Sequence, residues 1–310
     1  MLSMVVILSA CGTNQSQSTV GTEKKTIKIA YLPITHALPL HIESELGKSN
    51  LKNSNIELIK FGSWPELMDA LNTGKVDGAS VLIELAMKAK EQGIDLKTVA
   101  LGHRDGNVVV VANNINKVSD LKGKTFAIPH RLSTHNILLY KMLQKEGLTE
   151  KDVKIIELSP AEMPASLAEG RISGYIVAEP FGAKAVSMNK GKVLYQSNDL
   201  WQDSVCCGLV LRNDFIKNNP EVTQEFVNEY VKAGIKADTK DTQVQKVASN
   251  YMRVEQNILN LSMKWISFNE LKLRENDYNQ LRENLIEIGL AKNPPQYKDF
   301  VDSTFIDKVK

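Results

Sequence analysis

One stretch of this sequence occurs twice and decides the fold. Residues 63–89 read SWPELMDALNTGKVDGASVLIELAMKA, and residues 159–185 read SPAEMPASLAEGRISGYIVAEPFGAKA, at a constant offset of 96. Gly74 aligns with Gly170, and each separates a helical pattern from a short apolar run. Repeats of about 20–50 residues indicate solenoids, whereas two copies about a hundred residues apart predict two similar lobes. We therefore expect two α/β lobes, with a small-ligand site where they meet.

Composition fits two soluble globular domains. The chain has 310 residues, of which 43% are hydrophobic and 24% charged, and its formal net charge is +2. This length is sufficient for two sizeable cores. Because the net charge is small and no long run of Lys or Arg occurs, we expect no nucleic-acid partner.

Short apolar runs alternate with helical patterns as far as residue 212, and from residue 213 onward amphipathic helical patterns follow. Runs that are apolar on both faces are typical of covered parallel sheets. We interpret residues 107–113 and 205–212 as the crossing strands of a hinge. Lobe one then comprises residues 26–106 and 213–310, lobe two comprises residues 107–212, and the helical tail covers lobe one. The predicted strands are 26–32, 56–61, 78–83, 98–102, 107–113, 125–129, 153–158, 174–178, 192–196 and 205–212.

The N-terminus predicts export and anchoring. Residues 2–10 (LSMVVILSA) are apolar but too few to span a bilayer, and they have the shape of a secretory leader. The string that ends at Cys11 resembles the bacterial lipobox, in which the Cys is lipidated, although no basic residue precedes the run. The alternative is a buried N-terminal strand. Residues 12–25 are polar and low in complexity, which indicates a flexible tether.

Cys206 and Cys207 lie in the run VCCGLVL, which predicts a buried strand with two small apolar side chains. The sequence contains no CxxC and no His pair near these cysteines, so spacing gives no indication of a metal site. We therefore expect no metal and no cofactor. Catalysis is not expected either, because GxSxG, Walker, GxGxxG and paired-carboxylate motifs are absent.

Candidate ligand-binding residues follow the predicted strands. Loops at the carboxyl ends of parallel strands bind ligands in open α/β sheets, and helix N-termini attract anions. Thr35 and His36 begin the first helix of lobe one, and Ser133, Thr134 and His135 begin its counterpart in lobe two. The hydroxyl groups of Ser133 and Thr134 can also simply cap the helix.

Three further side chains are candidates, each with a structural alternative. Trp64 either lies against a planar or apolar part of the ligand or covers the core. Arg131 either binds a sulfonate or carboxylate in a bidentate manner or points to solvent. Glu179 follows an apolar strand and either forms a salt bridge with an Arg or binds an ammonium group.

The arrangement resembles a solute-binding lipoprotein of an ABC importer. The strings GHRDGN at 102–107, DLKGKT at 120–125 and YIVAEPFGA at 175–183, together with residues 162–164, resemble the nitrate, sulfonate, taurine and bicarbonate type. The resemblance implies a type II periplasmic-binding-protein-like fold that closes on an anionic or zwitterionic solute, with Asn107 among the binding residues. It also implies a cognate permease and ATPase, a monomer, and a place on the extracytoplasmic face of the membrane.

Two alternatives stay open at the level of sequence. A binding protein for a thiamine- or riboflavin-precursor heterocycle fits the same candidate residues. An enzyme similar to the fungal thiamine-pyrimidine synthases is less favoured, because only Cys206 and Cys207 stand where those enzymes carry a Cys-rich iron motif.

We predict that Cys11 is lipidated and anchors the protein. Cys11→Ala should release the chain from the membrane, because the acyl chains supply the anchoring free energy. Membrane fractionation and mass spectrometry of the N-terminal peptide measure this. Retention at the membrane of a chain whose peptide carries no acyl mass would contradict the prediction.

Overall fold

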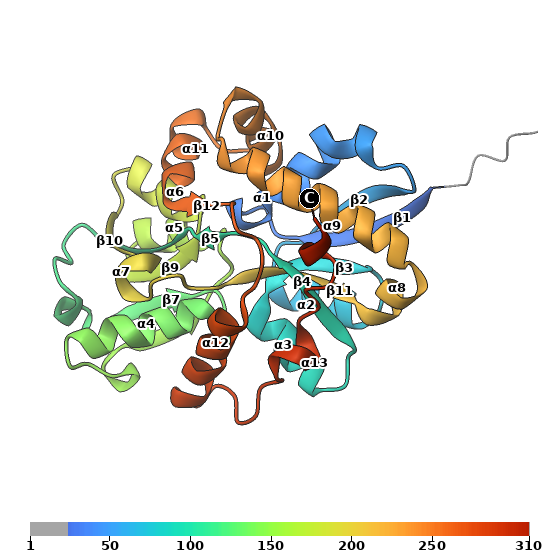
Figure 1. Cartoon of the computed structure of the whole chain (residues 1–310). Coiled ribbons are helices and arrows are strands. Elements are labelled where there is room, and N and C mark those ends of the chain that lie inside the picture. The colour runs from blue at the N-terminus through green and yellow to red at the C-terminus, as the bar shows by residue number, and fades with distance from the viewer. Residues whose placement is uncertain (1–23, 310) are drawn as a thin grey trace, which may run out of the picture.

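The computed structural model describes residues 24–309. Cys11, the leader and most of the predicted tether lie outside the described residues. Within residues 24–309, no helix has both the length and the apolar character needed to cross a membrane. Two five-stranded sheets, each with helices packed beside it, form two lobes (Figure 1).

Sheet one belongs to lobe one and has the strand order β2-β1-β3-β11-β4. β1 pairs in parallel with β2 and β3, whereas β11 runs antiparallel between β3 and β4. The strands are β1 (Lys25–Tyr31), β2 (Ser54–Lys60), β3 (Gly78–Leu82), β4 (Leu96–Leu101) and β11 (Cys207–Arg212).

Sheet two belongs to lobe two and repeats this topology, with the order β10-β6-β9-β7-β8. β7 pairs in parallel with β8 and β9, and β6 runs antiparallel between β9 and β10. The strands are β6 (Asn107–Val111), β7 (Thr125–Ile128), β8 (Lys154–Glu157), β9 (Gly174–Ala178) and β10 (Lys192–Gln196).

The glycines that the two copies share have the same physical role in both lobes. Gly74 and Gly170 follow the helices α2 (Trp64–Asn72) and α5 (Met163–Ala168) with φ of +74° and +71°, a conformation that favours glycine at helix C-termini. Gly78 and Gly174 begin β3 and β9, where an added Cβ would lie only 2.4 Å from Leu211 and 2.7 Å from Phe126. The repeat in the sequence therefore encodes a repeated strand–helix–strand unit.

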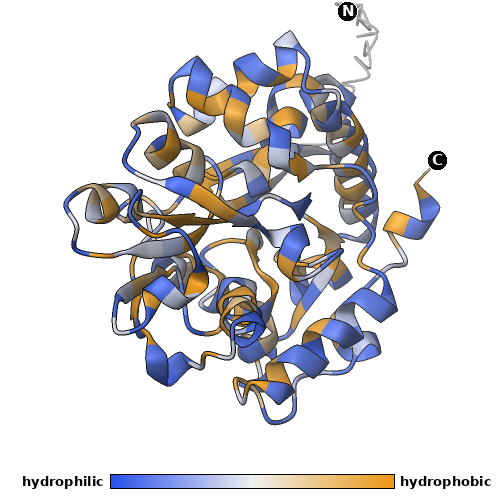
Figure 2. Cartoon of the chain, turned by 90° about the vertical axis from the view of Figure 1, so that its left-hand side faces the viewer, coloured by the Kyte–Doolittle hydropathy of each residue, from blue (hydrophilic) through white to orange (hydrophobic). Residues whose placement is uncertain are grey.

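Helices pack on the sheets of both lobes. Their apolar residues face the sheets, whose central strands are buried, and Figure 2 shows polar and apolar residues alternating along the outer helices. In lobe one these helices are α1 (Leu38–Ile42), α2 and α3 (Ile83–Glu91); in lobe two they are α4 (Thr134–Lys145), α5, α6 (Phe181–Ser187) and α7 (Ser197–Leu200).

The crossing strands differ from expectation in one respect. Residues 205–212 were expected in lobe two, but β11 pairs with β3 and β4 in sheet one, so this boundary was wrong. The chain enters lobe two through β5 (Arg104–Asp105) and β6 and returns just before β11. An apolar strand pattern shows that a strand is buried but does not indicate which sheet it joins.

The helical tail contacts both lobes, not lobe one alone as predicted. α9 (Pro220–Asp238) and α10 (Thr242–Met252) pack on α1, whereas α11 (Gln256–Ser262) packs on α6 of lobe two. β12 (Ile266–Ser267) then pairs with β5. The remaining tail elements are α8 (Asn213–Asn218), α12 (Glu275–Glu287) and α13 (Tyr297–Phe300).

A buried ion pair attaches the first crossing segment to this tail. Arg104 Nη1 lies 3.0 Å from Asp277 Oδ2 of α12, and the two side chains are only 8% and 9% exposed. Arg104 also donates to the carbonyl groups of Glu270 and Lys272. Because a buried charge is costly when it is unpaired, these bonds favour one position of the crossing segment against the tail.

Candidate functional site

The two lobes contact each other directly through hydrogen bonds. The backbone N–H of Thr35 in lobe one donates to the carbonyl oxygen of Glu179 in lobe two over 2.8 Å. The hydroxyl of Thr134 in lobe two forms hydrogen bonds with the carboxyl group of Glu84 in lobe one and, at 2.6 Å, with the carbonyl oxygen of Val205. We call the buried region around these contacts the interlobe seam, which comprises Thr35, His36, Glu84, His103, Asn107, Thr134, His135, Glu179, Cys206, Cys207 and Ser262.

Most of the residues predicted from the sequence are buried at or beside this seam. Those in the seam are Thr35, His36, Asn107, Thr134, His135 and Glu179, and Ser133 and Trp64 are also buried. Arg131 is the exception, because its side chain is exposed and donates to the carbonyl oxygen of Ile155 in β8 of its own lobe. The expectation that Arg131 faces an anion between the lobes is therefore wrong for this structure.

Several buried polar atoms in this region lack a partner anywhere in residues 24–309. They include both ring nitrogens of His135, both amide atoms of Asn107 and one carboxyl oxygen of Glu179. A buried polar atom left unpaired costs about 1–3 kcal/mol. Such atoms gathered where two lobes meet indicate a place where a bound ligand supplies the missing partners.

The residues at the start of α4 have two roles: Ser133 caps the helix, and Thr134 and His135 lie in the seam. Ser133 is the N-cap, and its hydroxyl accepts from Asn136 N at 3.3 Å, so the predicted capping role is confirmed. Thr134 and His135 follow as the first residues of the helix. Thr35 and His36 occupy the corresponding place in lobe one, in a short 3-10 turn, η1 (Thr35–Ala37), that precedes α1.

Within the described part of the chain, Glu179 forms no salt bridge with an Arg, which was one of its two expected roles. One of its oxygens accepts from Ala183 N in α6 at 2.8 Å and from Ser262 Oγ in α11 at 3.3 Å. Burial raises the pKa of Glu179 to about 8 and that of Glu84 to about 7, because no cation within the described chain offsets the loss of water around either group.

The histidines of the seam are neutral at physiological pH. Burial lowers the pKa of His103 and of His135 to about 3, and it lowers the pKa of His36 well below the usual value. None of the seam residues is Lys or Arg. The seam therefore offers neutral donors and acceptors together with two carboxyl groups of raised pKa.

His36, His103, Cys206 and Cys207 form a compact cluster in the seam. Each contributes one potential ligand atom, and these atoms all lie within 4.8 Å of one another. His36 Nδ1 lies 3.4 Å from Cys207 Sγ and 4.0 Å from Cys206 Sγ, and the two sulfur atoms are 3.9 Å apart. The imidazole rings of His36 and His103 stack with centroids 3.4 Å apart.

Sequence reasoning missed this cluster. The cysteines were interpreted as core residues, and they are indeed buried, but spacing gave no sign that two histidines lie beside them. His36 comes from the turn before the first helix of lobe one, and His103 comes from the first crossing segment. Cys206 and Cys207 come from the second crossing segment. The sequence offered two signals for this cluster. One is the polar His103 at the end of a predicted strand, and the other is the pair of cysteines at the start of another predicted strand.

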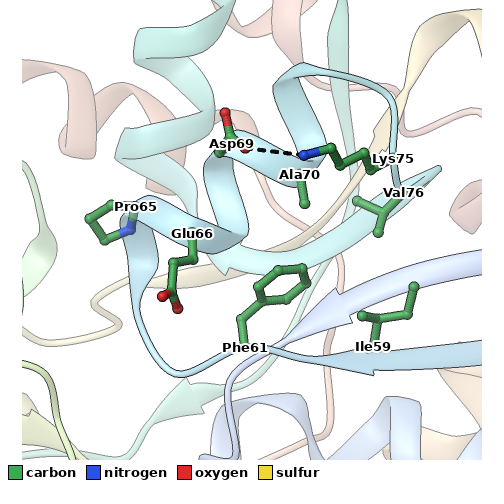
Figure 3. Close-up of a pocket in the computed structure, with 8 residues that line it drawn as sticks. All are labelled: Ile59, Phe61, Pro65, Glu66, Asp69, Ala70, Lys75 and Val76. Atoms are coloured by element: carbon green, nitrogen blue, oxygen red, sulfur yellow. Dashed lines mark ion pairs between the residues drawn. The ribbon is translucent and has the colours of Figure 1, made fainter.

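A separate pocket of about 660 Å³ lies on lobe one, where Phe61 and Ile59 of the β2 end face Pro65 and Ala70 of α2 (Figure 3). All the residues that line it come from lobe one. Closure of the lobes on a solute would therefore not complete this pocket, and the seam remains the better candidate site.

The model of the NMT1-like family matches residues 20–251, which is most of the chain. The chain belongs to this family. Among solved structures, it is similar to the ligand-binding component of an ABC-type import system from Staphylococcus aureus, determined with zinc bound. The two chains are 39% identical, the match covers 93% of this chain and 99% of the other, and the TM-score is 0.88.

Curated relatives are more distant. A nitrate/nitrite binding protein from Nostoc sp. strain PCC 7120 is 26% identical, over 68% of this chain and 53% of its own length. A putative aliphatic sulfonates-binding protein from Escherichia coli K12 is 28% identical, over 57% of each. The chain spans between about a third and somewhat over half the length of the curated relatives that it matches.

These findings confirm the resemblance to solute-binding proteins of ABC importers and the predicted two-lobed periplasmic-binding-protein-like fold. The two relatives and the solved structure named above are binding proteins, in agreement with the prediction that the chain is not an enzyme.

We predict that Glu179 makes the folded state less stable as the pH rises. Its folded pKa of about 8 lies above the ordinary carboxyl value, so the folded state binds the extra proton. The stability from this proton is fully present below the unfolded pKa, and it is lost as the pH rises through about 8. Glu179→Gln should flatten the fall in urea midpoint between about pH 5 and pH 8.5.

Glu84→Gln serves as the matched comparison, because the pKa of Glu84 is raised in the same direction, to about 7. Each single variant should remove part of the pH dependence, and the double variant should remove more than either. Urea midpoints of Glu179→Gln that run parallel to those of the parent over the whole range would contradict the prediction.

Proposed function

We propose that this chain is the extracytoplasmic solute-binding component of an ABC importer and that it captures its solute in the interlobe seam. One observation carries the proposal: where the lobes meet, buried polar atoms of His135 and Asn107 have no partner among residues 24–309. The family and the binding proteins to which the chain is similar support the same assignment.

Closure of the lobes would be the binding step. The hydrogen bonds from Thr35 to Glu179 and from Thr134 to Glu84 join the lobes and exclude water from the seam. A solute can enter only when these bonds are broken. Hinged closure about a few connecting residues is the usual motion of such two-lobed folds. The expected cognate permease and ATPase, the lipid anchor at Cys11 and the monomeric state are parts of this proposal.

For the solute, we favour a small anion or zwitterion of the nitrate, sulfonate, taurine or bicarbonate class. The nitrate/nitrite binding relative from Nostoc and the putative sulfonates-binding relative from E. coli support this class. Within the seam such a group would be held by neutral donors, which Asn107, His135 and the start of α4 offer. Because these donors are buried and uncharged, affinity should depend only weakly on salt.

A metal ion is a second candidate, supported by the zinc-bound Staphylococcus aureus neighbour and by the His–Cys cluster. A thiamine- or riboflavin-precursor heterocycle is a third, supported by the buried indole N–H of Trp64, which has no partner among residues 24–309. The three classes differ in which side chains they would use, so substitutions can separate them.

We predict that a thermal-shift screen of the purified chain identifies a solute of the favoured class. Nitrate, bicarbonate, taurine and a short alkanesulfonate are the first probes, because a ligand that binds only the native state raises its melting temperature. Asn107→Ala should then weaken binding of that probe by about tenfold to a hundredfold, the usual effect of losing one hydrogen bond to a charged group.

Asn113→Ala is the matched control, because Asn113 is exposed and donates only to the carbonyl oxygen of Asn189. It should bind the probe as the parent does. A screen in which no anion or zwitterion raises the melting temperature would contradict the favoured class. Tight binding by a folded Asn107→Ala variant would place the solute elsewhere.

A further inference from the structure

We propose that His36, His103, Cys206 and Cys207 bind one zinc ion at the hinge end of the interlobe seam. This site rests on the proposed function in one respect, which is that the lobes part at the seam to admit a ligand. No sequence motif indicates these four side chains as a coordinating set.

The spacing of the potential ligand atoms fits a tetrahedral ion. Zinc binds thiolate sulfur at about 2.3 Å and imidazole nitrogen at about 2.0–2.1 Å, so the edges of the tetrahedron measure about 3.8 Å between sulfurs and about 3.6 Å between sulfur and nitrogen. The sulfurs of Cys206 and Cys207 are 3.9 Å apart, and His36 Nδ1 lies 3.4 and 4.0 Å from them.

Backbone carbonyl groups orient both imidazoles. Gly106 O lies 3.3 Å from His36 Nε2, and Asp105 O lies 2.7 Å from His103 Nδ1. Each of these nitrogens then carries the proton, which leaves His36 Nδ1 and His103 Nε2 with free electron pairs. A metal-binding histidine usually donates its other N–H to a carbonyl or carboxylate in this way.

One ring must turn when the ion binds. A ligating imidazole has the ion in its own plane, and the rings of His36 and His103 are stacked at an interplanar angle of 24°. His36 and the two cysteines therefore supply three ligands close to where they lie. His103 completes the set after its Nε2 leaves the N–H of Cys207, 3.4 Å away, and the ring rotates about χ2, which also releases its Nδ1–H from Asp105 O.

Charge and burial favour zinc among the common ions. All four residues are buried, and a divalent ion with two thiolates and two neutral imidazoles has no net charge. Calcium and magnesium prefer oxygen ligands, which this cluster lacks. His135, with both ring nitrogens unpartnered among the described residues, lies on the lobe-two side of the seam and offers a further imidazole.

The position of the cluster gives the ion an entry path. His36 belongs to a loop of lobe one, His103 to the first crossing segment and the cysteines to the second. Lobe two covers them, because Thr134 donates to the carbonyl oxygen of Val205, next to Cys206. Parting the lobes breaks that bond and exposes the sulfur atoms.

We test the proposal with Co²⁺ and Zn²⁺ on the purified, reduced and metal-free chain in a Cys11→Ser background, where Cys206 and Cys207 are the only thiols. One equivalent of Co²⁺ should produce thiolate-to-metal charge transfer and the visible bands of a tetrahedral site, and one equivalent of Zn²⁺ should abolish both. Zn²⁺ binding should be weakened by more than about a hundredfold in each of the variants Cys206→Ala, Cys207→Ala and His36→Asn. Loss of a residue that only supports a metal ligand costs up to about a hundredfold in affinity, so loss of a ligand itself should cost more.

His130→Asn is the matched control, because His130 is a partly exposed histidine beside Glu157 and lies outside the cluster. It should bind both ions as the parent does, and circular dichroism without metal checks that each variant folds. Two outcomes would overturn the site: a folded, reduced chain that binds neither ion at micromolar concentration, or unchanged binding in the Cys206→Ala/Cys207→Ala double variant. A chain that binds a solute but no zinc would refute this site alone and leave the proposed function standing.

Discussion

The exchange of strands between the two sheets is the constraint on which the rest of the structure depends. β11 lies antiparallel between β3 and β4, although the chain has just left lobe two, and β6 occupies the corresponding place in sheet two after leaving lobe one. Neither sheet is complete without a strand that crosses. The lobes are therefore joined by two short connections next to their central strands, and this places His103 and the cysteines beside the hinge.

The seam combines close contact with unsatisfied polar groups. Its interlobe hydrogen bonds hold the lobes together, whereas burying atoms of Asn107, His135 and Glu179 that have no partner among residues 24–309 opposes this contact. A solute that supplies partners for these atoms would shift the balance toward the closed form, because a ligand changes such an equilibrium by its differential affinity for the two states. Since none of the seam residues is Lys or Arg, an anionic group in the seam would be held by hydrogen bonds and not by a salt bridge.

Much of the fold could be predicted from the sequence because the repeated residues have the same structural role in both lobes. Gly74 with Gly170, and Gly78 with Gly174, sit where backbone conformation or close packing requires glycine, so the two copies predict the two sheets. The same repeat predicts that Thr35 and Thr134 stand at corresponding helix starts, and both do, in η1 and at the first turn of α4. Long-range pairing could not be predicted: neither the position of β11 in sheet one nor the packing of α11 on lobe two is encoded in a local pattern. Arg131 and the His–Cys cluster show the same limit, since the outcome depended on contacts between distant segments.

Small-angle scattering tests most directly whether the seam is a site that opens and closes on a solute. We expect the ligand-free chain to have a larger radius of gyration than the chain saturated with the solute that raises its melting temperature. A solute that leaves the melting temperature unaltered should not change the radius. Equal radii with and without the saturating solute would show that the lobes do not close on it.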